Sequence, residues 1–154
     1  MSTTIDLPPD LLSAQAAPGR ILVIDDEPDI RDSLEALLTA EGYKVELAGN
    51  ATEGLKRLET HTYDLVLLDL MMPDKSGMQV LEEVRQRDRE TPIFMITAYG
   101  SVEVAVQALK RGASDYFSKP WDNEKLLVEI EHMISKHRLE LENAELKRAL
   151  KQRY

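Results

Sequence analysis

Four short hydrophobic runs of this chain each end in side chains that can handle a phosphoryl group and a divalent metal ion. These side chains are, in chain order, Asp25 and Asp26, then Asp69, then Thr97, then Lys119. An aspartate carboxylate can act as the nucleophile that forms an acyl phosphate. A hydroxyl and an ammonium group can both donate hydrogen bonds to phosphoryl oxygens. The ordered set therefore predicts a pocket for a phosphoryl group and a metal ion.

Three of these side chains are carboxylates, which repel one another unless a cation joins them. In a doubly wound sheet the carboxyl ends of neighbouring strands meet at a crevice, where Asp25, Asp26 and Asp69 would come together. An all-oxygen site of this kind suits Mg²⁺ or Mn²⁺ rather than a softer metal. A strand-end Asp, Thr or Lys taken alone is more often a helix cap or a solvated residue. The joint occurrence in this order is what carries the prediction.

The elements that must position these residues alternate regularly after Arg20. Short β-branched or leucine runs, suited to strands buried on both faces, alternate with amphipathic stretches of helical period. Five such units imply an α/β fold with a right-handed parallel sheet covered on both faces. We expect strands near 20–25, 44–48, 63–69, 92–97 and 114–118, and helices near 28–41, 51–60, 77–90 and 101–111.

Both ends of the chain depart from this alternation. Residues 1–19 are rich in Ser, Thr, Ala and Pro, and their prolines interrupt any helix, which predicts a flexible leader. The last helix begins after Pro120 and runs without a breaker to about Arg153, which is too long for one face of a domain. We therefore expect a single folded domain over 20–135, followed by a helical linker over 136–154.

The linker carries a short heptad pattern. Leu139, Asn143, Leu146 and Leu150 follow spacings of four, three and four, which fit positions d, a, d and a of a coiled coil. A buried Asn at an a position favours a parallel dimer in register. Two heptads are few and Leu141 fits neither position, so a solvated helix end stays open as the alternative. We expect a dimer arm that is weak on its own.

Composition narrows the classes of partner. The chain of 154 residues with 43% apolar content has room for one ordinary core plus an arm. A net charge of −9 argues against nucleic-acid binding, which depends on clustered Lys and Arg. No apolar run approaches the roughly 18 residues that cross a bilayer, and no secretion signal is recognisable. With no cysteine either, we expect a cytoplasmic protein that contacts neither nucleic acid nor membrane.

Across roughly residues 20–135 the chain resembles the receiver domain of two-component response regulators, the CheY-like family. The resemblance implies a five-stranded, doubly wound parallel sheet with strand order 2-1-3-4-5. The motifs that carry it are Asp25-Asp26-Glu27-Pro28, Leu68-Asp69-Leu70-Met71-Met72-Pro73-Asp74, Gly77, Thr97-Ala98, Gly112-Ala113, Asp115-Tyr116 and Lys119-Pro120.

The resemblance also implies roles for the carboxylates. Asp69 would be the phosphoacceptor, and a sensor histidine kinase would be the donor. Asp26, Asp69 and the backbone carbonyl of Met71 would ligate Mg²⁺, with Asp25 acting through a metal-bound water. The protein would then be a phosphoacceptor switch that assists only its own phosphorylation and dephosphorylation, and not an enzyme.

The same resemblance makes Thr97 and Lys119 the ligands of the phosphoryl oxygens and makes the Lys119-Pro120 peptide cis. A dianionic group on Asp69 would draw Thr97 toward it and leave space behind. Tyr116 matches the aromatic switch residue of the family and would rotate into that space. The alternative for Tyr116 is a static core aromatic.

The output is less specified. The expected changed face consists of the helix near 101–111, the strand near 114–118 and the last helix, so phosphorylation would alter how two copies pair. The stretch Lys136–Tyr154 looks like the linker to the AAA+ ATPase of NtrC-type activators of sigma-54 transcription. A phosphodiesterase or phosphatase output, or a receiver that acts alone, stays open as the alternative.

Rival classes lack a needed feature. A phosphatase of the haloacid-dehalogenase type needs a second Asp two residues after its nucleophile, where this chain has Met71. A flavodoxin-like cofactor binder needs a phosphate loop rich in Gly, Ser or Thr, whereas Asp25-Asp26-Glu27-Pro28 would repel a phosphate without metal. A purely structural dimer module would not explain the convergent Asp, Thr and Lys.

Overall fold

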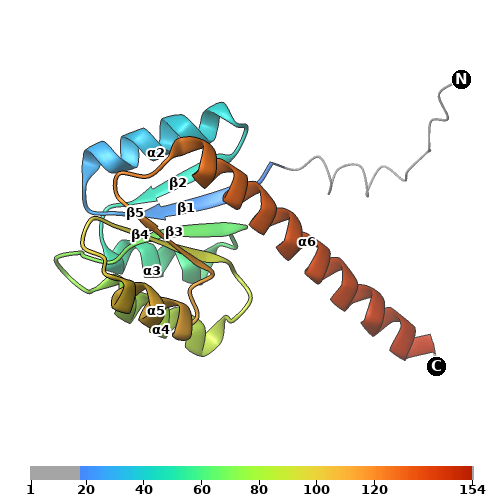
Figure 1. Ribbon diagram of the computed structural model, residues 1–154. Coiled ribbons are helices and arrows are strands. Elements are labelled where there is room, and N and C mark those ends of the chain that lie inside the picture. The colour runs from blue at the N-terminus through green and yellow to red at the C-terminus, as the bar shows by residue number, and fades with distance from the viewer. Residues whose placement is uncertain (1–17, 154) are drawn as a thin grey trace, which may run out of the picture.

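A central parallel sheet carries helices on both faces in the computed structural model, which describes residues 18–153 (Figure 1). Most of the predicted leader over 1–19 lies outside the described residues. The elements in chain order are β1 (Arg20–Ile24), α2 (Pro28–Ala40), β2 (Lys44–Ala48), α3 (Ala51–Thr60), β3 (Leu65–Asp69), α4 (Gly77–Arg87), β4 (Ile93–Thr97), α5 (Val102–Lys110), β5 (Asp115–Ser118) and α6 (Asn123–Arg153).

The five strands are all parallel and lie in the order β2-β1-β3-β4-β5. The predicted fold class and strand order are confirmed. Helices α2 and α6 cover one face of the sheet, and α3, α4 and α5 cover the other (Figure 1). Strand order changes direction beside β1, so the carboxyl ends of β1 and β3 lie at the point where such sheets bind ligands.

Alternation along the strands divides the core into two clusters. Ile21 and Val23 of β1 pack with α2 and α6, whereas Leu22 and Ile24 pack toward α3 and α4. All four side chains are fully buried. Since successive strand residues point to opposite faces, a strand covered on both sides must be apolar throughout. The buried run of β1 therefore ends at Ile24, and the next residue is the polar Asp25.

Most helix ends match the sequence, and one does not. Gly42 and Gly112 adopt positive φ angles of 91° and 114°, the left-handed conformation that follows a helix end. The helix predicted over 77–90 instead ends at Arg87. The Asp88 carboxylate accepts hydrogen bonds from the backbone N–H groups of Glu90 and Thr91 and from the Thr91 hydroxyl, and these bonds hold a turn. Local side-chain bonds of this kind compete with helix.

Helix α6 has a docked part and a free part. Leu126, Ile130 and Ile134 are buried at a spacing of four residues, and burial continues to His137. Every residue from 139 to 152 is exposed. The Arg138 guanidinium contacts the Asp64 carboxylate just before β3, with an Nε to Oδ1 distance of 3.3 Å. The exposed part of α6 thus leaves the sheet at the edge opposite the carboxyl ends of the strands. Within residues 18–153, no helix combines the length and the apolar character needed to cross a bilayer.

The docked part of α6 gives a direct test of the fold. Ile130 is fully buried, whereas Val128, half a turn away, is 62% exposed. Replacing Ile130 with Ala removes buried methyl groups and leaves a cavity, so we expect the free energy of unfolding to fall by about 2–5 kcal/mol. The Val128→Ala control should change it by less than about 0.5 kcal/mol. Urea denaturation of both variants measures this, and equal losses would show that α6 does not dock as described.

Candidate functional site

The carboxyl edge of the sheet brings the predicted site residues together. Asp25 follows β1, Asp69 ends β3, Thr97 ends β4, and Lys119 follows β5. Asp25, Asp69 and Thr97 are almost completely buried, and the Lys119 side chain is 8% exposed. The backbone N–H of Asp25 donates to the carbonyl of Ala48, which extends the β1 ladder to the site. The site is therefore built on the ends of rigid strands.

The Lys119 ammonium lies among three carboxylates. Its Nζ is 2.8 Å from Asp25 Oδ2, 3.4 Å from Glu27 Oε1 and 3.5 Å from Asp69 Oδ2. Burial lowers the pKa of this ammonium, but the hydrogen bond and charge of Asp25, with the charges of Asp69 and Glu27, outweigh burial and raise the pKa above its ordinary value. Lys119 therefore stays protonated and binds the cluster together.

The carboxylates form a group that fits a hard divalent cation. Ligand oxygens of Asp25, Asp26, Glu27 and Asp69 all lie within 4.8 Å of one another. An all-oxygen donor set of this kind suits Mg²⁺ or Mn²⁺. Glu27 was given no role from the sequence, although its place directly after the aspartate pair was a usable signal. No second group of this kind occurs in residues 18–153.

Crowding of the carboxylates changes the titration of Asp69. Burial first, and then the charge of Asp25, raise the pKa of Asp69 to about 7, while Lys119 and the Met71 backbone N–H act in the opposite direction. The Met71 N–H donates to Asp69 Oδ1 at 3.4 Å, which holds the Met71 peptide beside the carboxylate. The Met71 side chain itself is 53% exposed.

Thr97 and Lys119 are tied to each other by the backbone. The Lys119 N–H donates to the Thr97 carbonyl at 2.9 Å. The Thr97 hydroxyl accepts from the Tyr99 N–H at 3.2 Å and so faces the loop after β4. The Lys119-Pro120 peptide is cis, as predicted. Two side chains that can donate hydrogen bonds thus lie at the ends of the neighbouring strands β4 and β5.

Tyr116 of β5 packs against the core cluster beneath α3 and α4. Its hydroxyl is buried without a hydrogen-bond partner among the described residues, and burial raises its pKa. The hydroxyl lies against Gly100, where a Cβ would overlap it. The Tyr116 hydroxyl therefore lies on the inner side of the loop after β4. The rotation of this ring stays a prediction from the sequence.

Comparison with known proteins gives the same picture. The model of the response regulator receiver domain family matches residues 21–131. The transcriptional regulatory protein DltR of Streptococcus agalactiae is 44% identical over 111 residues, covering 72% of this chain and 50% of DltR. The regulatory protein AtoC of Escherichia coli is 34% identical over 132 residues, covering 86% of this chain and 29% of AtoC. The chain thus spans half or less of the length of these relatives.

Solved structures agree in fold. A CheY-like receiver domain protein from Methanospirillum hungatei has a TM-score of 0.77 at 35% identity, with 80% of this chain and 99% of that chain covered. NtrX from Brucella abortus has a TM-score of 0.78 at 32% identity, covering 84% of this chain and 30% of that chain. The beryllofluoride-activated NtrC4 receiver domain dimer has a TM-score of 0.73 at 34% identity, covering 77% and 98%.

The raised pKa of Asp69 predicts how Mg²⁺ acts on stability at different pH. Because the folded pKa lies above that of an unfolded Asp, the cation-free protein loses stability as pH rises through about 7. A cation offsets the repulsion only where the carboxylates are ionised. We expect MgCl₂ to raise the melting temperature more at pH 8 than at pH 5. At ten times the dissociation constant the gain is about 1.4 kcal/mol.

Thermal unfolding in MgCl₂ against NaCl of matched ionic strength makes this measurement. Asp26→Asn removes one candidate ligand and should reduce the Mg²⁺ effect, whereas Glu59→Gln, on the far end of α3, should leave it unchanged. A melting-temperature gain that is equal at both pH values, or equal in the Asp26 variant, would contradict cation binding at this cluster.

Proposed function

This chain belongs to the response regulator receiver domain family, and from that membership we propose that it accepts a phosphoryl group on Asp69 from a sensor histidine kinase. The observation that carries the proposal is that Asp25, Asp69 and Lys119 are buried in contact. The Lys119 Nζ lies 2.8 Å from the Asp25 carboxylate and 3.5 Å from the Asp69 carboxylate. The chain then serves as a phosphoacceptor switch in the cytoplasm and not as a general catalyst.

A divalent cation completes this site. Asp26, Asp69 and the Met71 carbonyl would hold Mg²⁺, with Asp25 acting through a water; Mn²⁺ has the same ligand preference. The bound ion supplies positive charge that neutralises the carboxylates and the incoming phosphoryl oxygens.

The side chains of the chain itself handle the transfer. An Asp69 carboxylate oxygen attacks phosphorus, the bond from phosphorus to the donor histidine nitrogen breaks, and that nitrogen keeps the electron pair. The Lys119 ammonium and the Thr97 hydroxyl supply hydrogen bonds to the phosphoryl oxygens, and both side chains are largely buried.

The consequence of phosphorylation is a redistribution of contacts. The new dianionic group attracts Thr97 and Lys119, so the loop after β4 moves with Thr97. That loop contains Gly100, on which the Tyr116 hydroxyl rests. Thr97 and Tyr116 therefore form the switch, and the face of α5, β5 and α6 changes with them.

The output passes through α6. Leu139, Leu146 and Leu150 are each more than half exposed along a helix that continues beyond the sheet. A second copy would cover them in a parallel coiled coil, with Asn143 at the seam. We place the domain over 20–135 and the dimer arm over 136–154. The similarity to an NtrC4 receiver domain that forms a dimer supports dimer formation.

We place the effector outside this chain, since the chain spans only part of AtoC and NtrX. Similarity to both proteins and the form of the linker favour the AAA+ ATPase of a sigma-54-dependent activator. A phosphodiesterase or phosphatase output is the alternative. The chain covers only half of DltR, which is also a transcriptional regulatory protein, so a transcriptional effector of another kind is compatible with that similarity.

Phosphorylation is tested with acetyl phosphate and Mg²⁺. We expect one acid-labile phosphoryl group per chain, measured by intact mass, because Asp69 is the single acceptor proposed among the carboxylates beside Lys119. Asp69→Asn should abolish the modification, while Asp32→Asn, on the exposed face of α2, should leave it unchanged. A phosphoryl group that persists in the Asp69 variant would place the acceptor elsewhere and overturn the proposal.

Measurement of the oligomeric state, with and without beryllofluoride, tests whether the arm forms a dimer. Leu146→Gln should raise the dimer dissociation constant by about tenfold or more, because burial of a leucine is worth about 1.5–3 kcal/mol. Leu141→Gln is the matched control, since Leu141 is exposed on the same helix but lies off the heptad seam. Light scattering of both variants measures the effect. Equal weakening by the two substitutions would argue against a coiled coil.

A further inference from the structure

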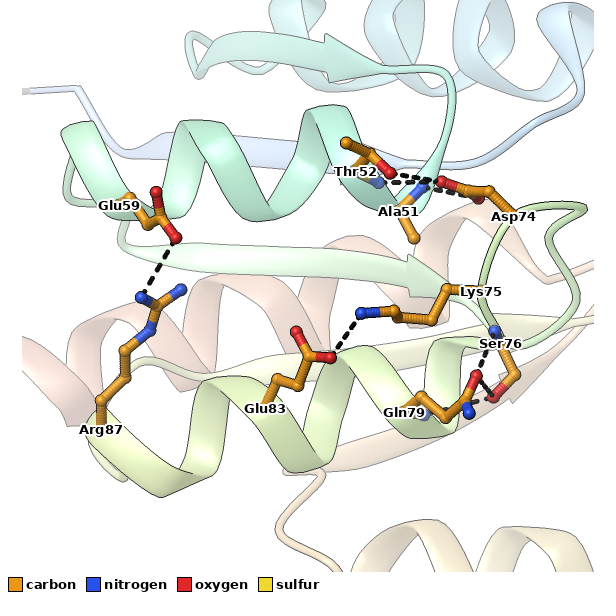
Figure 2. A network of polar contacts seen from close by, with 9 residues as sticks. All are labelled: Ala51, Thr52, Glu59, Asp74, Lys75, Ser76, Gln79, Glu83 and Arg87. Carbon is orange, nitrogen blue, oxygen red and sulfur yellow. Dashed lines mark hydrogen bonds and ion pairs between the residues drawn. The ribbon is translucent and has the colours of Figure 1, made fainter.

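The loop between β3 and α4 reaches across to α3 through a single carboxylate. Asp74 Oδ1 accepts the Ala51 N–H at 3.1 Å, and Asp74 Oδ2 accepts the Thr52 N–H at 3.0 Å and the Thr52 hydroxyl at 2.9 Å. Figure 2 shows these three bonds at the start of α3. The loop that carries Met71 is thus bound to a helix more than 20 residues earlier in the chain.

Physical chemistry makes this contact strong for an exposed side chain. The first N–H groups of a helix have no acceptor within the helix. Asn50 caps only Glu53, at 2.8 Å, so Asp74 serves Ala51 and Thr52. A negative charge at this end is also favoured by the helix dipole. The Thr52 N–H, above all, lowers the pKa of Asp74 to about 2, so the carboxylate is ionised throughout the neutral range.

The rest of the loop is fixed at its two ends. The Gly77 N–H donates to the Leu70 carbonyl at 2.7 Å, and a Cβ at Gly77 would overlap the Asp69 carbonyl. Ser76 and Gln79 form a capping box that begins α4 (Figure 2). Between these ends, Asp74 is the point that holds the loop to α3.

We propose that Asp74 is a positioning residue for the phosphoryl site: by binding the loop to the start of α3, it fixes the Met71 peptide beside Asp69 and thereby sets the affinity for Mg²⁺. This inference rests on the proposed function, because it assigns the Met71 carbonyl to the cation. Without Asp74 the loop loses its attachment to α3, and the Met71 peptide, whose N–H donates to Asp69 Oδ1, is held less firmly beside that carboxylate. Loss of an outer support of this kind weakens metal binding by about tenfold or more.

The test compares two capping residues of the same helix in the full chain. Asp74→Ala removes the cap and releases the loop, whereas Asn50→Ala removes a cap and leaves the loop attached. We expect Asp74→Ala to raise the Mg²⁺ dissociation constant about tenfold, while Asn50→Ala changes it less than about twofold. Calorimetric titration with MgCl₂ gives the constants. Amide hydrogen exchange at Met71 should be faster in Asp74→Ala than in the unaltered chain, and unchanged in Asn50→Ala. Asp74→Asn keeps an acceptor for the Ala51 N–H, so its Mg²⁺ dissociation constant and its Met71 exchange rate should lie between those of the unaltered chain and Asp74→Ala.

The outcomes separate this inference from the proposed function. If the unaltered chain binds Mg²⁺ and the two alanine variants weaken binding equally, Asp74 acts only through helix stability and the inference is wrong. It is also wrong if Asp74→Ala leaves both binding and Met71 exchange unchanged. If the unaltered chain binds no Mg²⁺, the proposed cation site fails and the inference fails with it.

Discussion

The structure depends on the burial of two carboxylates beside one ammonium. Asp25 and Asp69 are 2% and 4% exposed, and Lys119 is the cation that contacts both. Asp26 and Glu27 bring further oxygens within 4.8 Å of those of Asp25 and Asp69, so the four carboxylates carry more charge than the Lys119 ammonium neutralises when all are ionised. Buried like charges are costly unless they are paired. A hard divalent cation would offset this imbalance of charge.

The hydrophobic core limits the positions at which the charged side chains of the site can lie. The three central strands β1, β3 and β4 are apolar on both faces, and their polar residues stand only at the strand ends. Ile24 is fully buried in the cluster beneath α3 and α4, and the next residue is Asp25. Parallel pairing then puts the ends of β1, β3, β4 and β5 along one edge. The same sequence pattern, apolar strands with polar ends, therefore produces both the core and the charged site. A one-residue shift in the pairing register of a strand would disrupt both.

This coupling explains what the sequence predicted well and what it did not. The ends of hydrophobic runs placed Asp25, Asp69 and Thr97, because run endings and strand endings coincide in a buried sheet. The end of α4 was misplaced because Asp88 holds a turn that competes with helix. The bond from Asp74 to Thr52 had no signal in spacing or composition, since it joins a loop to the first turn of a helix in another unit. The burial of the Tyr116 hydroxyl on Gly100 depends on loop shape, which hydrophobic periodicity does not encode.

One continuous helix links the site to the arm. Helix α6 begins a few residues after Lys119, packs on the sheet through Leu126, Ile130 and Ile134, and has 31 residues. At about 1.5 Å per residue it spans roughly 46 Å. The contact of Arg138 with Asp64 holds α6 at the amino edge of the sheet, where the exposed leucines begin. Because α6 is attached to the sheet both by its buried residues and by Arg138, one continuous element connects the carboxyl edge, where Lys119 lies, with the exposed leucines beyond the amino edge.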